Sequence, residues 1–341
     1  MTYRMPAEWE PHEATWLAWP HQEADWPGKF APIPWVYTEI VRHLCTSERV
    51  RIVVANAVAE ADVREKLNHA GLDSDWITFW QMPTDRSWIR DFGPIYVKKG
   101  DERIALDWRF NAWAKYDNWQ ADDAIPSQIA PKQKLKRIEP MRNGKRVVLE
   151  GGSIDVNGQG LLLTTEECLL SSEQERNPGF NRTDYESVFA EYLGITQTIW
   201  LHRGIVGDDT HGHVDDLARF VAPRKVVTIV ETNENDENYA ALQENLERLR
   251  SFEIDGGKLE VLTLPMPRPV MFDGQRLPAS YANFYIANGV VLVPTFNDVN
   301  DKVALNTLAG LFPEREVVGI HAVDLVWGLG TLHCLSQQEP R

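Results

Sequence analysis

The sequence predicts an α/β fold in which a unit of two strands, a helix and a third strand recurs about five times around a common axis. Three observations support this prediction. Turn signals such as Asn157-Gly158 join pairs of apolar runs, helical segments follow these pairs, and a polar loop follows each unit. One polar residue from each unit recurs at intervals of about 50 to 70 residues, which implies radial repetition; these residues are Asp91, Glu150, His213, Asn283 and Cys334.

The amino-terminal units are predicted from strand-like runs and one helical segment. Residues 49–55 and 76–83 are predicted strands on either side of a helix over residues 61–70, and residues 95–108 form a hairpin. The three later units each begin with a hairpin, continue with a helix and end with a strand. They occupy, in that order, residues 153–164, 185–194 and 198–202; 217–231, 238–250 and 259–265; and 284–294, 303–312 and 316–322.

Composition favours a single domain over residues 1–341, with 43% hydrophobic and 25% charged residues and no linker or low-complexity tract. The first residues carry charges and proline where a signal peptide needs an apolar run, and no apolar segment of about 18 residues follows. The three cysteines are odd in number and widely spaced, which is typical of reduced thiols. We therefore expect a cytoplasmic protein.

The charge of the chain limits its partners. With 50 acidic and 35 basic residues the formal net charge is -15, which argues against nucleic acid and anionic membranes. Such a charge is compatible with a small cationic ligand, although on charge alone solubility is the favoured interpretation. The sequence leaves association into a homo-oligomer open.

Cys334 is the first candidate for chemistry. It follows a flexible GLGT turn and His333, in a polar loop with Ser336, Gln337 and Gln338. Cysteine is more often a small buried residue than a nucleophile, but this polar setting favours a reactive thiol. Cys45 and Cys168 are interpreted as structural.

The second candidate is the polar run GDDTHGHVDD, residues 207–216. A metal site is one interpretation, but the spacing matches neither HExxH nor a calcium loop, and no cysteine pair completes a zinc set. We therefore predict no metal and no cofactor. In an extended segment, His213 and Asp215 would project to the same side, so that a proton shuttle would lie beside an anionic clamp.

Two further motifs allow a functional and a plain interpretation. In WIRDFGP, Asp91 is a candidate ligand for a cation, whereas Arg90-Asp91 is also read as a surface ion pair. In LEGGSIDV, Glu150 ends an apolar strand before two glycines that permit close backbone approach, although a simple turn explains them as well.

A thiol, a histidine and several carboxylates together suit a guanidinium substrate. Two carboxylates can accept paired N–H donors from the planar cation and hold its central carbon over the sulfur of Cys334. His213 would then protonate the departing ammonia and later activate water on a covalent intermediate. The carboxylates should raise the thiol pKa of Cys334, so we expect the cationic substrate to promote ionisation of the thiol.

The motifs MPAEWEPHEATWLAWP, WIRDFGP, FNAW, LEGGSID, GDDTHGHVDDLARF, LPASYANFYIANGVVLVP and GLGTLHCLSQQEP occur in this order. In these motifs the chain resembles the agmatine deiminases, within the group that includes the bacterial peptidyl-arginine deiminases. The resemblance spans nearly the whole chain. It implies the pentein fold, a five-bladed α/β propeller with pseudo-five-fold ββαβ repeats, and hydrolysis of agmatine to N-carbamoylputrescine and ammonia in putrescine biosynthesis.

The resemblance also implies roles for individual residues. Cys334 would be the nucleophile, His213 the acid and base, and Asp91 and Asp215 the carboxylates that hold the guanidinium. Four further residues would line the pocket: Trp88, Glu150, Asp209 and Asn283, the last of which is also read as a strand cap. After FNAW the chain runs AKYDNWQADD, where the family is expected to be glycine-rich, so the pocket lid is expected to differ.

Two alternatives remain at this point. A deiminase of peptidyl or free arginine would need a cation for the extra carboxylate or amide, and a signal peptide and an added domain would favour its peptidyl branch. A non-catalytic pentein-fold binding protein belongs to another class, and it would not need Cys334, His213 and the acidic pair together.

Overall fold

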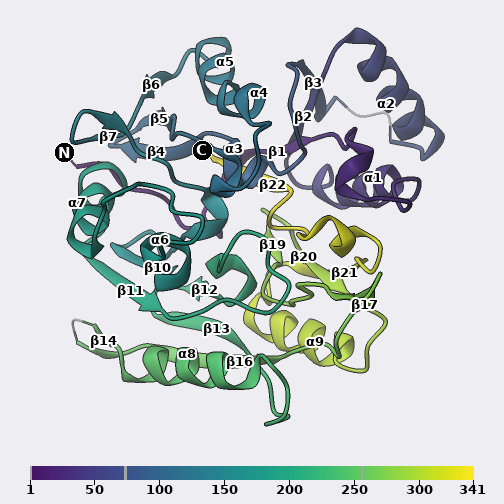
Figure 1. The fold of residues 1–341 in the computed structure, drawn as a ribbon. Helices are drawn as coiled ribbons and strands as arrows, with labels where there is room; N and C mark the ends of the chain where they lie inside the picture. The colour runs from purple at the N-terminus through teal and green to yellow at the C-terminus, as the bar shows by residue number, and fades with distance from the viewer. Residues whose placement is uncertain (1, 73–74, 255) are drawn as a thin grey trace.

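The computed structural model describes residues 2–72, 75–254 and 256–341. Within these residues, five sheets of three or four strands lie around the middle of the molecule, and most of the longer helices lie toward its periphery (Figure 1). Smaller hairpins accompany them: β7 (Met141–Arg142) with β8 (Lys145–Arg146), β14 (Glu253–Ile254) with β15 (Gly257–Lys258), and β17 (Met271–Phe272) with β18 (Gln275–Arg276). The α/β class predicted from the sequence is confirmed.

Four of these sheets share one strand order. In each, the middle strand pairs antiparallel with the strand before it and parallel with the strand after it, which is the predicted order of two strands, a helix and a third strand. They comprise β4 (Ile95–Lys99), β5 (Glu102–Leu106) and β6 (Lys136–Ile138); β9 (Asp155–Val156), β10 (Leu161–Thr165) and β11 (Gln197–Leu201); β12 (Ala218–Ala222), β13 (Lys225–Val230) and β16 (Glu260–Pro265); and β19 (Tyr285–Ile286), β20 (Val290–Thr295) and β21 (Glu316–His321).

The remaining sheet joins the two ends of the chain. β1 (His12–Ala18) pairs parallel with β2 (Arg49–Val54), and β2 pairs parallel with β3 (Ile77–Gln81). On its other edge β1 pairs antiparallel with β22 (Ser336–Pro340). The sequence predicted neither β1 nor β22.

The polar loop predicted after Cys334 is wrong for residues 336–340, which form a buried strand. Its polar side chains have partners inside the protein. Glu339 accepts a hydrogen bond from Trp16 Nε1 at 2.9 Å, and it forms ion pairs with Arg51 at 2.9 Å and Arg103 at 3.0 Å. Paired charges are tolerated in a protein interior, so a polar strand can be a central element here.

The helices predicted from the sequence are present, and the structure adds others. The predicted segments correspond to α2 (Ala57–His69), α7 (Arg182–Leu193), α8 (Tyr239–Ser251) and α9 (Asp301–Leu311). The additional helices are α1 (Ile33–Leu44), α3 (Ile89–Phe92), α4 (Gln120–Asp123), α5 (Ile125–Lys132) and α6 (Glu166–Leu170).

Local sequence explains where α7 begins and ends. Asn181 and Asp184 form a capping box at its start. At its end Gly194 has a φ of 73°, and a Cβ atom at this position would lie 2.0 Å from the carbonyl oxygen of Tyr3. Only glycine satisfies both constraints, so α7 stops where the amino-terminal segment passes.

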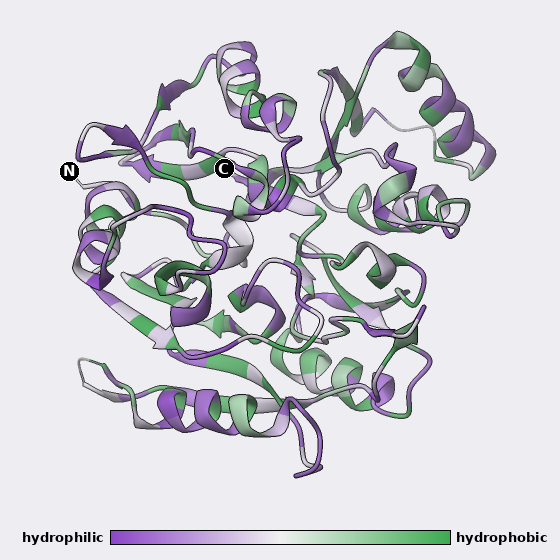
Figure 2. Cartoon of the chain, viewed as in Figure 1, coloured by the Kyte–Doolittle hydropathy of each residue, from purple (hydrophilic) through white to green (hydrophobic). Residues whose placement is uncertain are grey.

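The core consists of the sheets and the inner faces of the helices. Hydrophobic residues concentrate along the strands, while α8 carries both hydrophilic and hydrophobic residues (Figure 2). On α8 the buried positions include Leu242, Leu246 and Leu249, a spacing that places one apolar face on the sheet. No helix in the described part of the chain is long and apolar enough to cross a membrane.

Candidate active site

A cavity of about 310 Å³ contains the predicted thiol. Cys334, Trp88 and Asp91 line one part of it, and Asp25, Arg86 and Asp209 belong to a second group of lining residues. Gly330 lets the thiol and the indole approach, because a Cβ atom there would lie 2.8 Å from the ring of Trp88 and 3.1 Å from Cys334 Cβ.

Cys334 is almost completely buried, and polar atoms surround its sulfur. The side-chain amide of Asn283 donates a hydrogen bond to Sγ at 3.1 Å, and the thiol donates to Asp215 Oδ2 at 3.6 Å. Burial raises the pKa of the Cys334 thiol well above its usual range, and Asp215, Asp216 and Asp91 raise it further. The free protein therefore holds Cys334 as a neutral thiol.

Asp91 lies on the short helix α3, with its carboxylate inside the protein. Trp113 Nε1 donates to Asp91 Oδ2 at 2.9 Å, and the backbone N–H of Gly152 donates to Oδ1 at 3.0 Å. Burial raises the pKa of Asp91 to about 6; His213 opposes the rise, and Asp215 adds to it. A cation in the cavity would favour the charged form.

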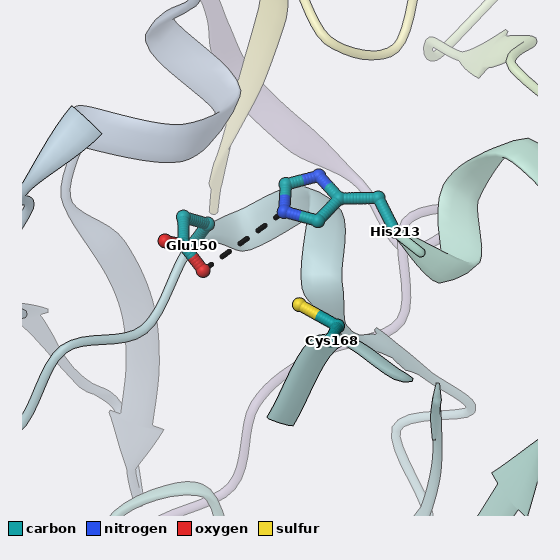
Figure 3. A group of neighbouring side chains, drawn as sticks. All are labelled: Glu150, Cys168 and His213. Carbon is teal, nitrogen blue, oxygen red and sulfur yellow. Dashed lines mark ion pairs between the residues drawn. The ribbon is translucent and has the colours of Figure 1, made fainter. Parts of the chain in front are cut away.

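His213 lies between two carboxylates. Its Nδ1 is 3.8 Å from Asp91 Oδ1, and its Nε2 is 3.9 Å from Glu150 Oε2 (Figure 3). Among the residues that the structure describes, neither ring nitrogen has a hydrogen-bond partner. Burial alone would lower the pKa of His213, but Asp91, Cys168 and Glu150 hold it well above its usual value, so the ring carries a proton.

Glu150 is fixed from behind by an arginine. Arg176 Nε donates to Glu150 Oε1 at 2.9 Å, and both side chains are buried. Burial favours protonation of Glu150, but Arg176 and His213 lower its pKa to about 2. Glu150 thus stays charged, and its free Oε2 faces the imidazole.

Gly152 shows how closely the site groups converge. A Cβ atom at this position would lie 2.6 Å from His213 Nδ1, 2.9 Å from Asp91 Oδ1 and 3.0 Å from Asp215 Oδ2. Three functional groups from two segments of the chain, Asp91 from one and His213 and Asp215 from the other, therefore meet beside one glycine, and the glycine predicted to permit close approach does so.

Asp215 lies in a 3-10 helix, Val214–Asp216, so the extended conformation expected for this segment is wrong. The tight turn still brings both side chains close to Gly152, because His213 directly precedes the helix. His333 Nδ1 bonds Asp215 Oδ2 at 2.7 Å. Burial favours the protonated form of Asp215, but His333 and His213 lower its pKa below the usual value.

A strained turn places Trp113 over the site. Ala112, Trp113 and Ala114 have φ values of 49°, 58° and 53°, in the left-handed region that non-glycine residues rarely adopt. The turn directs the indole N–H to Asp91. The segment after FNAW, which was expected to form a different lid, continues from this turn and contributes Tyr116 to the cavity.

The second group of lining residues pairs charges of both signs. Asp25 Oδ1 accepts from Arg86 Nη1 at 2.5 Å, and Asp209 accepts from Tyr116 OH at 2.6 Å and from Lys115 Nζ. Both oxygens of Asp209 are thus engaged, whereas Asp25 Oδ2 is buried without a hydrogen-bond partner. Burial raises the pKa of Asp25 to about 6, against the effect of Arg86.

A second buried polar cluster supports Asp215. Glu8 contacts Arg90 at 3.2 Å, Arg219 at 2.9 Å and His333 at 2.8 Å. Arg90 also donates to Gln338 at 2.6 Å and to the carbonyl oxygen of His333 at 3.2 Å. The interpretation of Arg90-Asp91 as a surface ion pair is therefore wrong, because Arg90 is buried and bonds other residues.

The structure brings together all eight residues selected from the sequence. Trp88, Asp91, Asp209 and Cys334 line the cavity, whereas His213, Glu150, Asp215 and Asn283 are buried behind its surface. Asn283 contacts the thiol, so its role extends beyond that of a strand cap.

Several neighbours of the site were not predicted. Asp25, Arg86 and Trp113 line the cavity, Glu8 and His333 hold Asp215, and Cys168 lies beside His213. Trp113 and Glu8 belong to motifs already singled out, FNAW and MPAEWEPH, which is the signal that could have found them. His211 was left without a role, and its Nε2 bonds Ser171 Oγ at 3.1 Å.

A buried thiol, an imidazolium and several carboxylates at one cavity define a thiol hydrolase of cationic C–N substrates, the deiminase class. The family model described as Porphyromonas-type peptidyl-arginine deiminase matches residues 4–340. The chain belongs to this family, as the sequence motifs suggested, and it is an enzyme that hydrolyses C–N bonds of amidines.

Individual relatives agree with the family. The agmatine deiminase of Ectopseudomonas mendocina is 35% identical over 99% of this chain and 95% of the relative. The solved agmatine deiminase of Enterococcus faecalis has a TM-score of 0.90 and 33% identity, covering 99% of this chain and 96% of the other. A C. jejuni agmatine deiminase with substrate bound has a TM-score of 0.88 and 30% identity, covering 100% and 97%. The pentein fold expected from the resemblance is confirmed.

Proposed function

We propose that residues 1–341 form one catalytic domain that hydrolyses agmatine to N-carbamoylputrescine and ammonia through Cys334. The observation that carries this proposal is the cluster of Cys334, Asp91, Asp215 and His213 at one cavity, which Cys334 and Asp91 line and behind which Asp215 and His213 lie. Sγ lies 3.6 Å from Asp215, and His213 lies 3.8 Å from Asp91. The names of the relatives support the same substrate.

The reaction begins with binding of the guanidinium between Asp91 and Asp215, beside the ring of Trp88. The carboxylates accept N–H donors from the planar cation, which holds its central carbon near Sγ. The thiolate of Cys334 forms a C–S bond and gives a neutral tetrahedral adduct. His213 then donates its proton to one NH₂ group, the C–N bond breaks, and ammonia leaves a cationic amidino-thioether.

Water completes the reaction in the second half. His213, now neutral, takes a proton from the water that attacks the same carbon, and Glu150 balances the imidazolium that forms. The C–S bond breaks, the hydroxyl proton of the adduct passes to the sulfur of Cys334, the neutral ureido product leaves, and His213 again holds its proton. One molecule of water is consumed for each ammonia released.

Substrate binding supplies the charge that ionises Cys334. In the free protein the thiol pKa is raised by burial and by Asp215, Asp216 and Asp91, and a bound guanidinium places a positive charge among these groups. The thiol then loses its proton to water. Thiolate absorbance should accordingly rise when a non-reactive guanidinium is added, and a fully ionised Cys334 in the free protein at neutral pH would contradict this step.

The second group of lining residues favours agmatine over arginine. Asp25 has a buried oxygen without a partner, which suits the ammonium end of agmatine. Arg86 is the cation that an arginine carboxylate would require, but it is held by Asp25 and Asn118 and lies 4.3 Å from the ring centre of Tyr116. The charge of Arg86 is already compensated by Asp25. A substrate carboxylate that approached Arg86 would therefore also be repelled by the carboxylate of Asp25.

Ammonia release tests the function directly. Wild type and Cys334→Ala should be compared on agmatine, arginine and a blocked arginyl peptide, with Cys45→Ala as the matched thiol control. We expect rapid release from agmatine by wild type and by Cys45→Ala, and a loss of at least about 10⁴-fold in Cys334→Ala. Equal rates in wild type and Cys334→Ala would refute the covalent mechanism, and faster release from arginine or the peptide would reassign the substrate.

We also propose a cytoplasmic protein with no nucleic-acid partner. The net charge of -15 and the three free cysteines support this proposal.

A further inference from the structure

Cys168 forms a compact group with two residues of the site. Its sulfur, the imidazole of His213 and the carboxylate of Glu150 each offer an atom within 4.8 Å of the other two (Figure 3). Cys168 lies on α6, Glu150 directly precedes Gly151, and His213 directly precedes the 3-10 helix Val214–Asp216. The proposed reaction uses His213 and Glu150 but gives Cys168 no step.

The group has unused bonding capacity in a buried place. Both ring nitrogens of His213 and Glu150 Oε2 lack hydrogen-bond partners, and all three side chains are buried. Arg176 engages Glu150 Oε1 and leaves Oε2 free to bind one further partner. Buried polar atoms without partners are costly, so their presence here points to a ligand.

We propose that Cys168, Glu150 and His213 bind a thiophilic divalent cation, Zn²⁺ above all, and that this cation switches the enzyme off by occupying the imidazole. One sulfur, one nitrogen and one oxygen ligand suit zinc, whereas calcium and magnesium require mainly oxygen. The ligand atoms must approach slightly, because zinc bonds are about 2.0 to 2.3 Å long.

The surroundings of His213 fit this role. Zn²⁺ would displace the Nε2 proton of the imidazolium and the thiol proton of Cys168, and both protons would pass to water. Nδ1 would keep its proton and donate to Asp91, which lies 3.8 Å away. A carboxylate behind a coordinating histidine is the usual arrangement at zinc sites, since it fixes the ring and increases its basicity.

The sulfur is held in place relative to His213. Thr165 caps α6 through the backbone N–H of Cys168 at 3.0 Å, and its hydroxyl donates to the carbonyl oxygen of Gly212 at 2.6 Å. One side chain thus links the helix of Cys168 to the residue before His213. None of the three metal-ligand candidates is among the described residues that line the cavity, so we expect slow binding.

Cadmium absorbance tests the site without relying on the proposed reaction. The background is Cys334→Ser, which removes the thiol of the cavity, and Cd²⁺ is added while thiolate-to-metal absorbance is recorded. We expect saturation at about one ion per chain. The signal should disappear when Cys168→Ala is added and persist when Cys45→Ser is added instead. Absence of the signal in Cys334→Ser, or its persistence without Cys168, would overturn the proposal.

A second variant covers a failure of Cys168→Ala to fold. His213→Asn in the same Cys334→Ser background removes the nitrogen ligand and should weaken Cd²⁺ binding by at least about 100-fold, because loss of outer partners alone costs about 10- to 100-fold. Unchanged affinity in this variant would also refute the site.

Inhibition by Zn²⁺ is the functional readout, and it rests on the proposed function. Ammonia release from agmatine should fall slowly after Zn²⁺ is added to wild type and recover with a chelator. In Cys168→Ala, compared with its own metal-free rate, inhibition should require about 100-fold more Zn²⁺. Equal inhibition of wild type and Cys168→Ala would exclude Cys168 as a ligand. Absence of any ammonia release before zinc is added would instead contradict the proposed function and leave the absorbance result to decide the site.

Discussion

Two buried polar clusters lie side by side in this protein and differ in how their bonds are used. In the Glu8 cluster, formed with Arg90, Arg219 and His333, both oxygens of Glu8 and both ring nitrogens of His333 have partners. In the His213 cluster, formed with Asp91, Glu150 and Asp215, four polar atoms have no hydrogen-bond partner in the described part of the chain, and their ion-pair distances are long, at 3.8 and 3.9 Å. These atoms are His213 Nδ1 and Nε2, Glu150 Oε2 and Asp215 Oδ1.

The difference separates structure from function. A buried polar group without a partner costs free energy, so a cluster that keeps several of them is reserved for a ligand. In the Glu8 cluster the atom of this kind is Arg219 Nη2, which still pairs with Glu8 Oε1 at 2.9 Å, so this cluster holds the fold. The two clusters meet where His333 bonds Asp215 at 2.7 Å. Substitutions in the first should mainly reduce stability, and those in the second should mainly reduce activity.

Among substitutions in the two clusters, His213→Asn should have the largest effect on activity. We expect kcat to fall by about 10²- to 10⁴-fold, because the variant lacks the acid and base. The free energy of unfolding should fall by less than in Glu8→Gln, because Asp91 and Glu150 keep Trp113, Gly152 and Arg176 as partners. Ammonia release and urea unfolding measure the two quantities. His211→Asn, near in sequence but bonded to Ser171, is the control and should keep its activity. A large loss of stability in His213→Asn would break the comparison.

Glu8→Gln should have the next largest effect, and chiefly on stability. Removing the charge leaves Arg90 and Arg219 partly unpaired in the interior, so the free energy of unfolding should fall by about 3 to 5 kcal/mol. Glu10→Gln is the control, since Glu10 pairs with Arg4 near the surface and should cost no more than about 1 kcal/mol. Urea titrations decide, and equal stability of both variants would refute a structural role for the Glu8 cluster.

Gly152→Ala should reduce activity by about 100-fold through displacement alone. Its Cβ would approach His213, Asp91 and Asp215 at 3.0 Å or less, so at least one of them must move. Gly310→Ala on α9 is the matched control, because nothing lies within 4 Å of the added atom. Full activity in Gly152→Ala would show that the three groups need not converge as closely as they do here.

Asp25→Asn extends the comparison to the second group of lining residues. Among the described residues, Asp25 Oδ2 has no hydrogen-bond partner, whereas both oxygens of Asp209 are bonded to Lys115 and Tyr116. Only Asp25→Asn should therefore raise the KM for agmatine, by about 10- to 100-fold. The KM for butylguanidine, which lacks the ammonium, should not change. An equal rise for both substrates, or a larger rise in Asp209→Asn, would place the ammonium elsewhere.

Acid should act in opposite directions on Asp91 and Glu8, one residue from each cluster. The pKa of folded Asp91 is raised from 3.8 to about 6, so its contribution to stability is present at low pH and is lost as pH rises through about 6. The pKa of Glu8 is lowered, so Glu8 stabilises the folded protein at pH values above the usual glutamate pKa and loses this contribution to stability on acidification. Relative to Asp91→Asn, the free energy of unfolding of wild type should therefore decrease as the pH is raised from about 4 to about 6, which urea unfolding measures.

The same titration should shape activity. Below about pH 6, kcat/KM for agmatine should fall by about tenfold per pH unit, because a protonated Asp91 no longer holds a cation. A profile that stays flat down to pH 4 would contradict the role of Asp91.

Most of the later units were predictable because their signals are local. Apolar runs joined by Asn157-Gly158 and Asn288-Gly289 turns define hairpins from a few residues, and α8 has a clear helical pattern. β22 was missed because its sequence, SQQEP, is polar throughout. Only partners from distant segments, such as Arg51 and Arg103, make its burial favourable.

The site was predictable where motifs carry it and unpredictable where separate units meet. Cys334, His213 and Asp91 follow from their motifs. Cys168 lies in the apolar segment EECLL, and local sequence does not reveal that α6 places it against His213. Asp25 was missed for the same reason, since its partner Arg86 is remote in sequence and its unbonded oxygen is visible only in the cavity.

The pairing of β1 with β22 means that the first sheet is complete only when the last strand has formed. β1 is synthesised before residues 336–340, so its edge opposite β2 has no partner strand until those residues have been made. Cys334 is made just before that strand, so every other site residue is finished earlier. Until residues 336–340 have paired, β1 keeps an open edge and Trp16 Nε1 lacks its acceptor Glu339, so completion of the sheet and completion of the site depend on the same short segment.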